Sequence, residues 1–193
     1  MTQHLILAST SVYRRQLLER LRLPFTCVAP EVIETPLPDE APDRLAQRLA
    51  IEKAAAVATG RPDALVIGGD QVCVRDGTMV GKPGSRAAAA EQLSASSGKR
   101  LVFFTGLCLM SSDGDMQTAV VASTVTMRAL SDSEIARYIE LDRPVDCAGS
   151  FKWESLGVAL FERLESTDPT ALQGLPLITL CDMLRHAGLD PLA

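Results

Sequence analysis

Residues 64–84 constrain the fold of this chain more than any other segment. The segment opens with a short apolar run at residues 64–67, rich in β-branched side chains, which is typical of a strand buried on both faces. Gly68 and Gly69 end this run, and Asp70 follows directly. We therefore predict a buried strand with a carboxylate just past its carboxyl end, where open α/β sheets place their ligands.

The rest of the segment predicts a hairpin that leads into a loop with a lysine. Asp76-Gly77 stands between two short apolar runs, a strong local signal for a tight turn. The second run leads to Gly81-Lys82-Pro83-Gly84. This loop is not a Walker A motif, because Gly77 is one residue too close and Pro83 replaces the required Ser or Thr. Taken alone, the acid and the loop are each more often structural than functional.

Composition and charge narrow the class of protein. The 193 residues are 47% hydrophobic and 22% charged, which suits one globular domain with an ample core. The net charge of −5 gives no general attraction to nucleic acid. The apolar run at residues 5–8 is too short for a signal peptide or a membrane span. Five scattered cysteines without a Cys-x-x-Cys pair favour a reducing compartment. We therefore expect a cytoplasmic protein with neither nucleic acid nor a membrane as partner.

Strand and helix patterns alternate along the chain, which predicts an α/β fold with a mixed sheet. Ser9-Thr10-Ser11 can cap the first helix, and Ser131 with Glu134 forms a capping box. Strands are expected at residues 4–8, 25–29, 64–67, 101–110, 117–128 and 157–163. Helices are expected at residues 12–21, 42–58, 85–98, 131–141 and 176–188.

Two cationic side chains fall on apolar helix faces. Arg14 shares the inward side of the first helix with Leu18, and Lys53 lies within the apolar stripe of the second helix. A cation there is costly unless it meets an anion or reaches solvent, so either a phosphate site or an ordinary salt bridge is expected. Glu34, in a proline-bounded acidic loop, is either solvated or a metal ligand. His4 and His186 give no support for a histidine-based triad.

Together these pieces resemble the Maf family of nucleotide pyrophosphatases over nearly the whole chain. The order and spacing of the motifs, more than any single one, make the match specific. The motifs are Leu7-Ala8-Ser9-x-Ser11-x-x-Arg14-Arg15, Glu34, Arg48-Leu49-Ala50-x-x-Lys53-Ala54, Asp70-Gln71-Val72, Gly81-Lys82-Pro83, Thr105-Gly106, Ala148-Gly149 and Gly174-Leu175-Pro176-Leu177.

The resemblance implies a single domain over residues 1–193, with two lobes, a mixed, strongly twisted sheet and a cleft between the lobes. It also implies hydrolysis of a nucleoside triphosphate to its monophosphate and pyrophosphate with a divalent cation, Mg²⁺ or Mn²⁺. By residue, the family pattern assigns phosphate contacts to Ser9, Arg14, Lys53 and Lys82. It assigns the metal and water to Glu34 and Asp70, with Asp70 as proton acceptor. The expected catalytic residues are therefore Asp70, Lys82, Lys53 and Arg14.

Three further positions resemble the 7-methyl-GTP pyrophosphatase branch of the family. Many members of the family have an arginine, a threonine and a glutamine at these positions, whereas this chain has Tyr13, Gln71 and Glu154. N7-methylated guanine is cationic, which favours an aromatic ring and a carboxylate. We therefore expect Tyr13, Gln71 and Glu154, with Ser9, to bind the substrate.

Two other readings stay open. The first is a pyrophosphatase for dTTP, UTP or another modified nucleotide, and the second is a non-catalytic nucleotide-binding regulator of cell division. The presence of Asp70, Glu34 and Lys82 favours catalysis. The sequence does not give the oligomeric state, and a homodimer is kept as a candidate.

Overall fold

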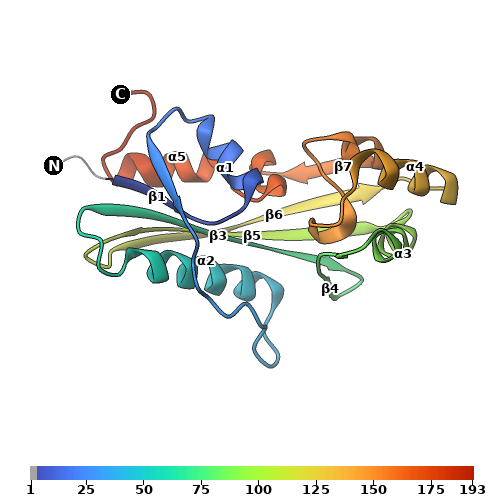
Figure 1. Cartoon of the computed structure of the whole chain (residues 1–193), viewed down its shortest axis with the longest axis horizontal. Helices are drawn as coiled ribbons and strands as arrows, with labels where there is room; N and C mark the ends of the chain where they lie inside the picture. The colour runs from blue at the N-terminus through green and yellow to red at the C-terminus, as the bar shows by residue number, and fades with distance from the viewer. Residues whose placement is uncertain (1–3) are drawn as a thin grey trace. The chain divides into compact units, whose positions relative to one another are not determined.

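The computed structural model describes residues 4–193 and shows a mixed α/β fold (Figure 1). Its sheet has seven strands in the order β2-β1-β3-β5-β6-β7, with β4 paired to β3. The strands are β1 (His4–Ala8), β2 (Phe25–Val28), β3 (Ala64–Arg75), β4 (Thr78–Val80), β5 (Arg100–Ser111), β6 (Met116–Met127) and β7 (Phe161–Ser166). The α-helices are α1 (Val12–Glu19), α2 (Pro42–Ala58), α3 (Arg86–Ser96), α4 (Asp132–Asp142) and α5 (Leu177–His186). The predicted fold class is confirmed.

Three short 3₁₀-helices complete the secondary structure of residues 4–193. They are η1 (Ala148–Ser150), η2 (Leu156–Leu160) and η3 (Pro169–Gln173). The chain divides into two compact units. The first contains the described residues up to Gln71, with Phe104–Val121 and Asp168–Ala193, and the second contains Val72–Phe103 and Ala122–Thr167.

In the first unit, helices cover both faces of the sheet. β1 runs parallel to β2 and β3, and side chains alternate between the two faces of each strand. Leu5 and Ile67 are among the residues that pack with α1 and α5, whereas Ile6 and Val66 pack with α2. Figure 1 shows α1 and α5 on one side of the strands and α2 on the other. Burial on both faces explains why residues 64–67 are continuously apolar.

β3 does not end at the two glycines, so the prediction of a strand that stops before Asp70 is wrong. β3 continues to Arg75. Gly68 is needed for packing instead, because a Cβ there would lie 2.1 Å from the carbonyl oxygen of Ala50 in α2. Its lack of a side chain lets α2 lie close against an unbroken strand. The strand turns only at Asp76, and the predicted hairpin with β4 is confirmed.

The strand expected at residues 157–163 is also displaced. Residues 156–160 form η2, and β7 begins only at Phe161. Gly157 donates a backbone hydrogen bond to the carbonyl of Lys152, and a Cβ on it would lie 2.4 Å from that oxygen. A tight turn therefore occupies the residues before β7, and the strand starts late.

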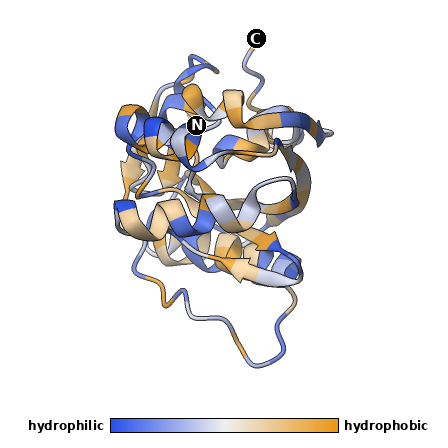
Figure 2. Ribbon diagram, turned by 90° about the vertical axis from the view of Figure 1, so that its right-hand side faces the viewer, coloured by the Kyte–Doolittle hydropathy of each residue, from blue (hydrophilic) through white to orange (hydrophobic). Residues whose placement is uncertain are grey.

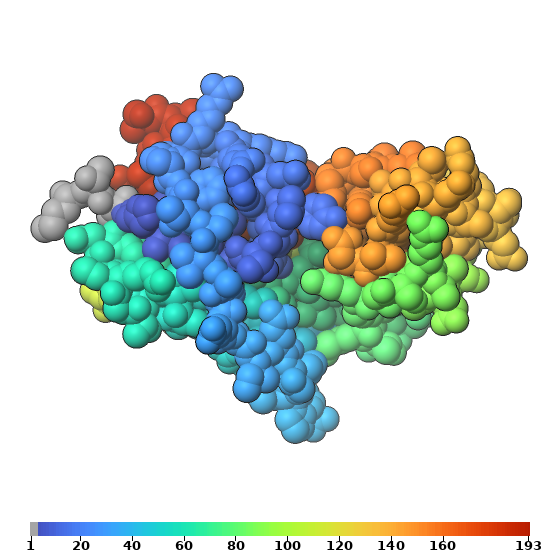
Figure 3. Space-filling model, viewed as in Figure 1, coloured from blue at the N-terminus to red at the C-terminus, as the bar shows by residue number. Residues whose placement is uncertain are grey.

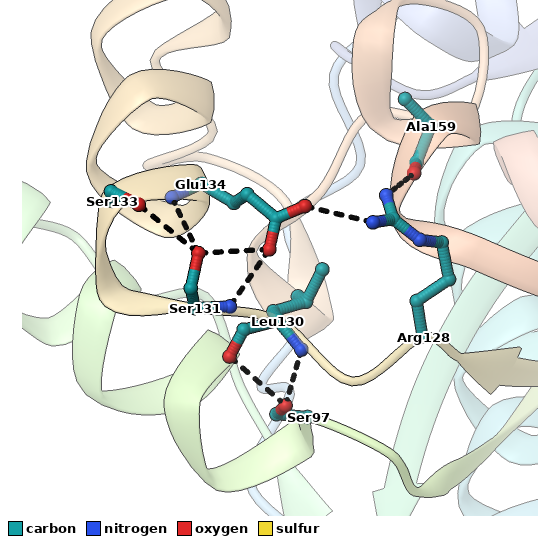
Figure 4. A network of polar contacts seen from close by, with 7 residues as sticks. All are labelled: Ser97, Arg128, Leu130, Ser131, Ser133, Glu134 and Ala159. Atoms are coloured by element: carbon teal, nitrogen blue, oxygen red, sulfur yellow. Dashed lines mark hydrogen bonds and ion pairs between the residues drawn. The ribbon is translucent and has the colours of Figure 1, made fainter.

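The predicted capping box at the start of α4 is confirmed (Figure 4). The Ser131 hydroxyl accepts from the backbone N–H of Glu134, and the Glu134 carboxylate accepts from the backbone N–H of Ser131 at 2.8 Å. Arg128 donates to Glu134 at 2.8 Å and to the carbonyl of Ala159 at 2.8 Å. The hydrogen bond from the Ser131 N–H makes the largest contribution to lowering the pKa of Glu134 to about 2, and the hydrogen bond from Arg128 makes the next largest. This network fixes the N-terminus of α4 in the second unit.

The second unit has an aromatic core. The ring of Phe151 packs edge-on against Phe103 and Phe161, with centroids 5.4 and 4.7 Å apart.

Hydrophobic and hydrophilic residues alternate along the helices in Figure 2, as expected for helices that bury one face. Within residues 4–193, no helix has the length and apolar character to cross a membrane.

Candidate active site

Asp70 and Lys53 form the centre of the candidate site in the first unit. Asp70 follows Val66 and Gly68 at every second position of β3, so it lies on the face that α2 covers. Lys53 lies on the buried face of α2, and its Nζ is 2.7 Å from Asp70 Oδ1. Both residues are buried. The sequence predicted the inward position of Lys53, and the structure supplies the carboxylate that compensates its charge.

A second carboxylate reaches the same ammonium group. Glu34 comes from the segment between β2 and α2, and its Oε1 lies 2.6 Å from Lys53 Nζ. The Glu34 side chain is 61% exposed, so it approaches Lys53 from the solvent side. Lys53 therefore bridges the two carboxylates to which the family resemblance assigns a metal.

The donor chemistry of these two carboxylates fits a hard divalent cation. Mg²⁺ is commonly held by one or two carboxylates and completes its coordination with water and substrate phosphates. Within the described part of the chain, no group of three or more His, Cys, Asp or Glu side chains has metal-binding geometry. Glu34 and Asp70 would therefore hold such a cation together with oxygen atoms that the substrate and water provide.

Arg14 is the second cation of the site. Its Nε donates to the carbonyl of Gly174 at 2.9 Å, and its Nη1 lies 3.5 Å from the buried hydroxyl of Ser9. Burial lowers the pKa of Arg14, and the charges of Asp70 and Glu34 act in the opposite direction. Arg14 therefore interacts electrostatically with both carboxylates.

The start of α1 orients Arg14 and Ser9. The hydroxyl of Ser11, the N-cap, accepts from the backbone N–H of Arg14 at 3.3 Å. The hydroxyl of Ser9 accepts from the backbone N–H of Ser11 at 3.1 Å. The helix N-terminus thus presents a hydroxyl and a guanidinium side by side, an arrangement suited to an anion.

Gln71 faces away from Asp70, because neighbouring residues of a strand point to opposite faces. Its Nε2 donates to Thr105 Oγ1 at 3.0 Å and to the carbonyls of Ala171 and Leu172 at 2.8 and 3.1 Å. These contacts tie β3 to η3, which leads directly to Gly174, the acceptor of Arg14. The contacts shown for Gln71 are thus to the protein, and its contact with substrate stays a prediction.

Asp168 is a residue of the first unit that the sequence reasoning missed. It is buried, and its carboxylate accepts from the hydroxyl of Thr170 at 2.7 Å and from the backbone N–H of Thr179 at 3.1 Å. It therefore fixes η3 against α5. Asp168 followed by Pro169 is an N-cap signature, which was the available signal.

The remaining predicted residues lie in two places. Tyr13 is half-buried in α1 of the first unit. Lys82 belongs to the second unit, where the adjacent Gly81 carbonyl accepts from Gln92 at 3.2 Å. Glu154 is also in the second unit, and loss of hydration raises its pKa, an effect that Asp142 reinforces. The structure thus brings Ser9, Arg14, Glu34, Lys53 and Asp70 together and places Lys82 and Glu154 in the other unit.

Two solved structures share low sequence identity with the chain. The Ham1 protein of Staphylococcus aureus matches with 14% identity and a TM-score of 0.48, over 80% of this chain and 89% of that one. A nucleoside-triphosphatase / dITP/XTP pyrophosphatase from Mycobacterium abscessus matches with 15% identity and a TM-score of 0.42, over 66% of this chain and 75% of that one.

The family resemblance is confirmed along nearly the full length of the chain. A sequence model of the family described as Maf-like protein matches residues 4–187. This range includes every residue assigned above to the candidate site in either unit. The chain belongs to the family of Maf-like proteins.

Proposed function

We propose that this protein is a nucleoside triphosphate pyrophosphatase that releases a nucleoside monophosphate and pyrophosphate. The observation that carries the proposal is the buried Lys53, held between Asp70 and Glu34 with Arg14 nearby. Cations at such a site can bind phosphate oxygens, and a carboxylate beside them can accept a proton from water. Membership of the Maf-like family supports this reading of the site.

The charges of the site support a role for a divalent cation. Arg14 and Lys53 carry two positive charges, which Asp70 and Glu34 cancel in the free protein. A triphosphate adds about four negative charges, which must be neutralised as the transition state forms. Mg²⁺ or Mn²⁺ held by Glu34 and Asp70 would supply positive charge that the four side chains lack. We propose Lys82 as a further phosphate contact, because the family pattern assigns it that role.

We propose the following roles for these groups in the reaction. Arg14, Lys53 and the Ser9 hydroxyl bind phosphate oxygens and hold the triphosphate in place. Asp70 accepts a proton from a water molecule while the water oxygen attacks the α-phosphorus. The bond from the α-phosphorus to the bridging oxygen breaks, and pyrophosphate leaves with that oxygen. A general base of this kind typically contributes ~10²–10⁴-fold to the rate.

A panel of nucleoside triphosphates tests the proposed activity. With Mg²⁺ or Mn²⁺, the purified protein should release pyrophosphate and monophosphate in equal amounts from at least one of them. Addition of a chelator should abolish the reaction, and excess cation should restore it. Release of orthophosphate and diphosphate would refute the proposal. Tight nucleotide binding without any hydrolysis would favour the non-catalytic regulator.

We further propose 7-methyl-GTP as the preferred substrate, with Tyr13 and Glu154 reading the base. An aromatic ring stacked on a cationic base contributes ~0.5–2 kcal/mol. A charge-assisted hydrogen bond contributes roughly 1.5–3 kcal/mol. Glu154 can accept from the guanine N–H groups and also attract the positive charge that methylation adds. A base that lacks this charge gains only the hydrogen bonds.

Glu154→Gln should lower kcat/KM for 7-methyl-GTP at least about tenfold more than for GTP, since ~1.4 kcal/mol corresponds to tenfold. Only the methylated base carries the charge that the carboxylate attracts. Because the pKa of Glu154 is raised, the wild-type preference should also weaken as the pH falls through that pKa and the carboxyl group is neutralised. Steady-state kinetics with both substrates measure the ratio directly.

Glu162→Gln is the matched control, because Glu162 is another exposed glutamate of the second unit. It should leave the ratio unchanged. An unchanged ratio in Glu154→Gln would show that Glu154 does not read the methylated base, and dTTP, UTP or another modified nucleotide would become the leading substrate.

A further inference from the structure

Arg48 contacts two carboxylates and a backbone carbonyl, yet none of the roles above involves it. It lies on α2, five residues before Lys53. Its Nε and Nη2 donate to the two oxygens of Glu40 at 2.7 and 2.8 Å, and its Nη1 lies 3.1 Å from both oxygens of Glu52. Nη2 also donates to the carbonyl of Thr35 at 3.2 Å. Each of the five guanidinium N–H groups thus has an acceptor.

Two of the three partners of Arg48 lie on one segment. Thr35 and Glu40 belong to residues 29–41, which connect β2 to α2 and contain no helix or strand. In Figures 1 and 3 this segment runs along the surface, and its tip projects beyond α2. Thr35 directly follows Glu34, so the contact of Arg48 with its carbonyl holds the backbone next to the Glu34 carboxylate.

Glu40 extends this contact into a closed turn. Its carboxylate accepts from the backbone N–H of Leu37 at 3.0 Å, and its own N–H donates to the carbonyl of Leu37 at 3.2 Å. Hydrogen bonds lower the pKa of Glu40 to about 2, and the bonds from Arg48 contribute more to this shift than the bond from Leu37. Glu40 therefore stays charged at neutral and mildly acidic pH and remains a partner for Arg48.

Burial indicates which ion pair fixes the segment. The Lys53 side chain is only 7% exposed, whereas the Glu34 side chain is 61% exposed, so the contact with Lys53 holds the carboxylate end of Glu34 but leaves most of that side chain in solvent. The side chains of Arg48 and Glu40 are only 22% and 8% exposed, and their contact is bidentate. A bidentate arginine–carboxylate pair fixes both direction and distance. Lys53 thus contacts the Glu34 carboxylate, whereas Arg48 and Glu40 hold the backbone of the segment that carries it.

We propose that Arg48 and Glu40 are positioning residues that hold Glu34 beside Lys53 and so prepare the site for the triphosphate. This inference rests on the proposed function, because Glu34 and Lys53 are the residues through which the pair acts. Glu52 provides the matched comparison. It contacts the same guanidinium as Glu40, but it lies on α2 itself and does not touch residues 29–41 in these contacts.

Glu40→Ala and Glu52→Ala therefore separate positioning from simple loss of an arginine partner. Glu40→Ala should lower kcat/KM by about 10- to 100-fold, because small displacements of a catalytic constellation are costly. Glu52→Ala should stay within about twofold of wild type, since surface ion pairs on a helix contribute little. The backbone N–H of Leu37 should exchange with solvent faster in Glu40→Ala only. Equal losses in the two variants would overturn the proposal.

A double-mutant cycle with Glu34→Gln tests whether the pair acts through Glu34. Once Glu34 has lost its charge, Glu40→Ala should cause little further loss of kcat/KM. A full additional loss would show that Glu40 supports the fold rather than Glu34. The same cycle should be measured on the binding of GTP with a methylene group between its α- and β-phosphorus. If the wild-type protein hydrolyses no triphosphate, the proposed function fails, but the binding cycle still tests the positioning role. Non-additive effects of Glu40→Ala and Glu34→Gln on binding would support that role, and additive effects would refute it.

Discussion

Asp70→Asn should fold like wild type and lose about 100- to 10,000-fold of kcat, the range typical of a lost general base. The substitution is isosteric, and the asparagine oxygen can still accept from Lys53 Nζ, which lies 2.7 Å from Asp70 Oδ1. Glu34 keeps a negative charge beside Lys53, so the buried ammonium is not left without a counter-charge. The variant therefore removes the proposed proton acceptor and one of the two carboxylates proposed to hold the divalent cation, and it changes little in the fold.

Asp76→Asn is the control for this experiment. Asp76 follows β3 directly, but it lies in an exposed turn with a positive φ of 50°, a conformation that asparagine adopts readily. Its activity and melting temperature should match wild type. Pyrophosphate release and thermal unfolding, measured on both variants, check the prediction. Near-normal turnover in a folded Asp70→Asn protein would remove Asp70 from the catalytic role.

Helical periodicity predicted the residues of the site that lie on α2. The expected helix at residues 42–58 has the observed bounds, and Lys53 falls on its buried face as its place in the apolar stripe required. The reason is physical: each turn of a helix repeats the same direction, so a sequence pattern fixes which side chains are buried. The counter-charge of Lys53 could not be read in the same way, because pairing across elements depends on tertiary packing.

Because the sequence predicted that the strand ends before Asp70, it did not predict the directions of the Asp70 and Gln71 side chains. A glycine pair within an apolar run is typical of a turn, but it also permits close approach of another backbone, and sequence alone does not separate these causes. Because β3 continues through Asp70 and Gln71, the two side chains point to opposite faces. Asp70 therefore meets α2, and Gln71 meets η3.

The contacts of residues 29–41 were out of reach of sequence reasoning for a different reason. This segment has no periodic pattern, so no side chain in it can be assigned a direction. The pairing of Arg48 with Glu52 follows from helical spacing, since the two are four residues apart. Its pairing with Glu40 depends on the path of an irregular segment, which only the structure reveals.

Gly68→Ala should destabilise the protein by about 3 kcal/mol or more, at the upper end of what overpacking a core costs. A Cβ at this position would lie 2.1 Å from the carbonyl oxygen of Ala50 and 2.8 Å from the backbone nitrogen of Ala54. These are backbone atoms of α2, so no side-chain rotation relieves the clash and the helix has to move. For a chain of this size, such a loss corresponds to a fall in melting temperature of roughly 6–12 °C.

Gly69→Ala is the matched control, because it changes the same residue type one position further along the same strand. Both variants lower the conformational entropy of the unfolded chain to the same extent, so this contribution to stability cancels when the two are compared. The nearest atom to a Cβ on Gly69 is Arg14 Nε at 3.5 Å, an ordinary contact, and the melting temperature should stay close to wild type. Lys53 lies between Ala50 and Ala54 along α2, so displacement of the helix in Gly68→Ala should also pull its ammonium away from Asp70 and reduce pyrophosphate release. Equal melting temperatures for the two variants would mean that α2 can shift without cost, and that Gly68 does not set the distance between Lys53 and Asp70.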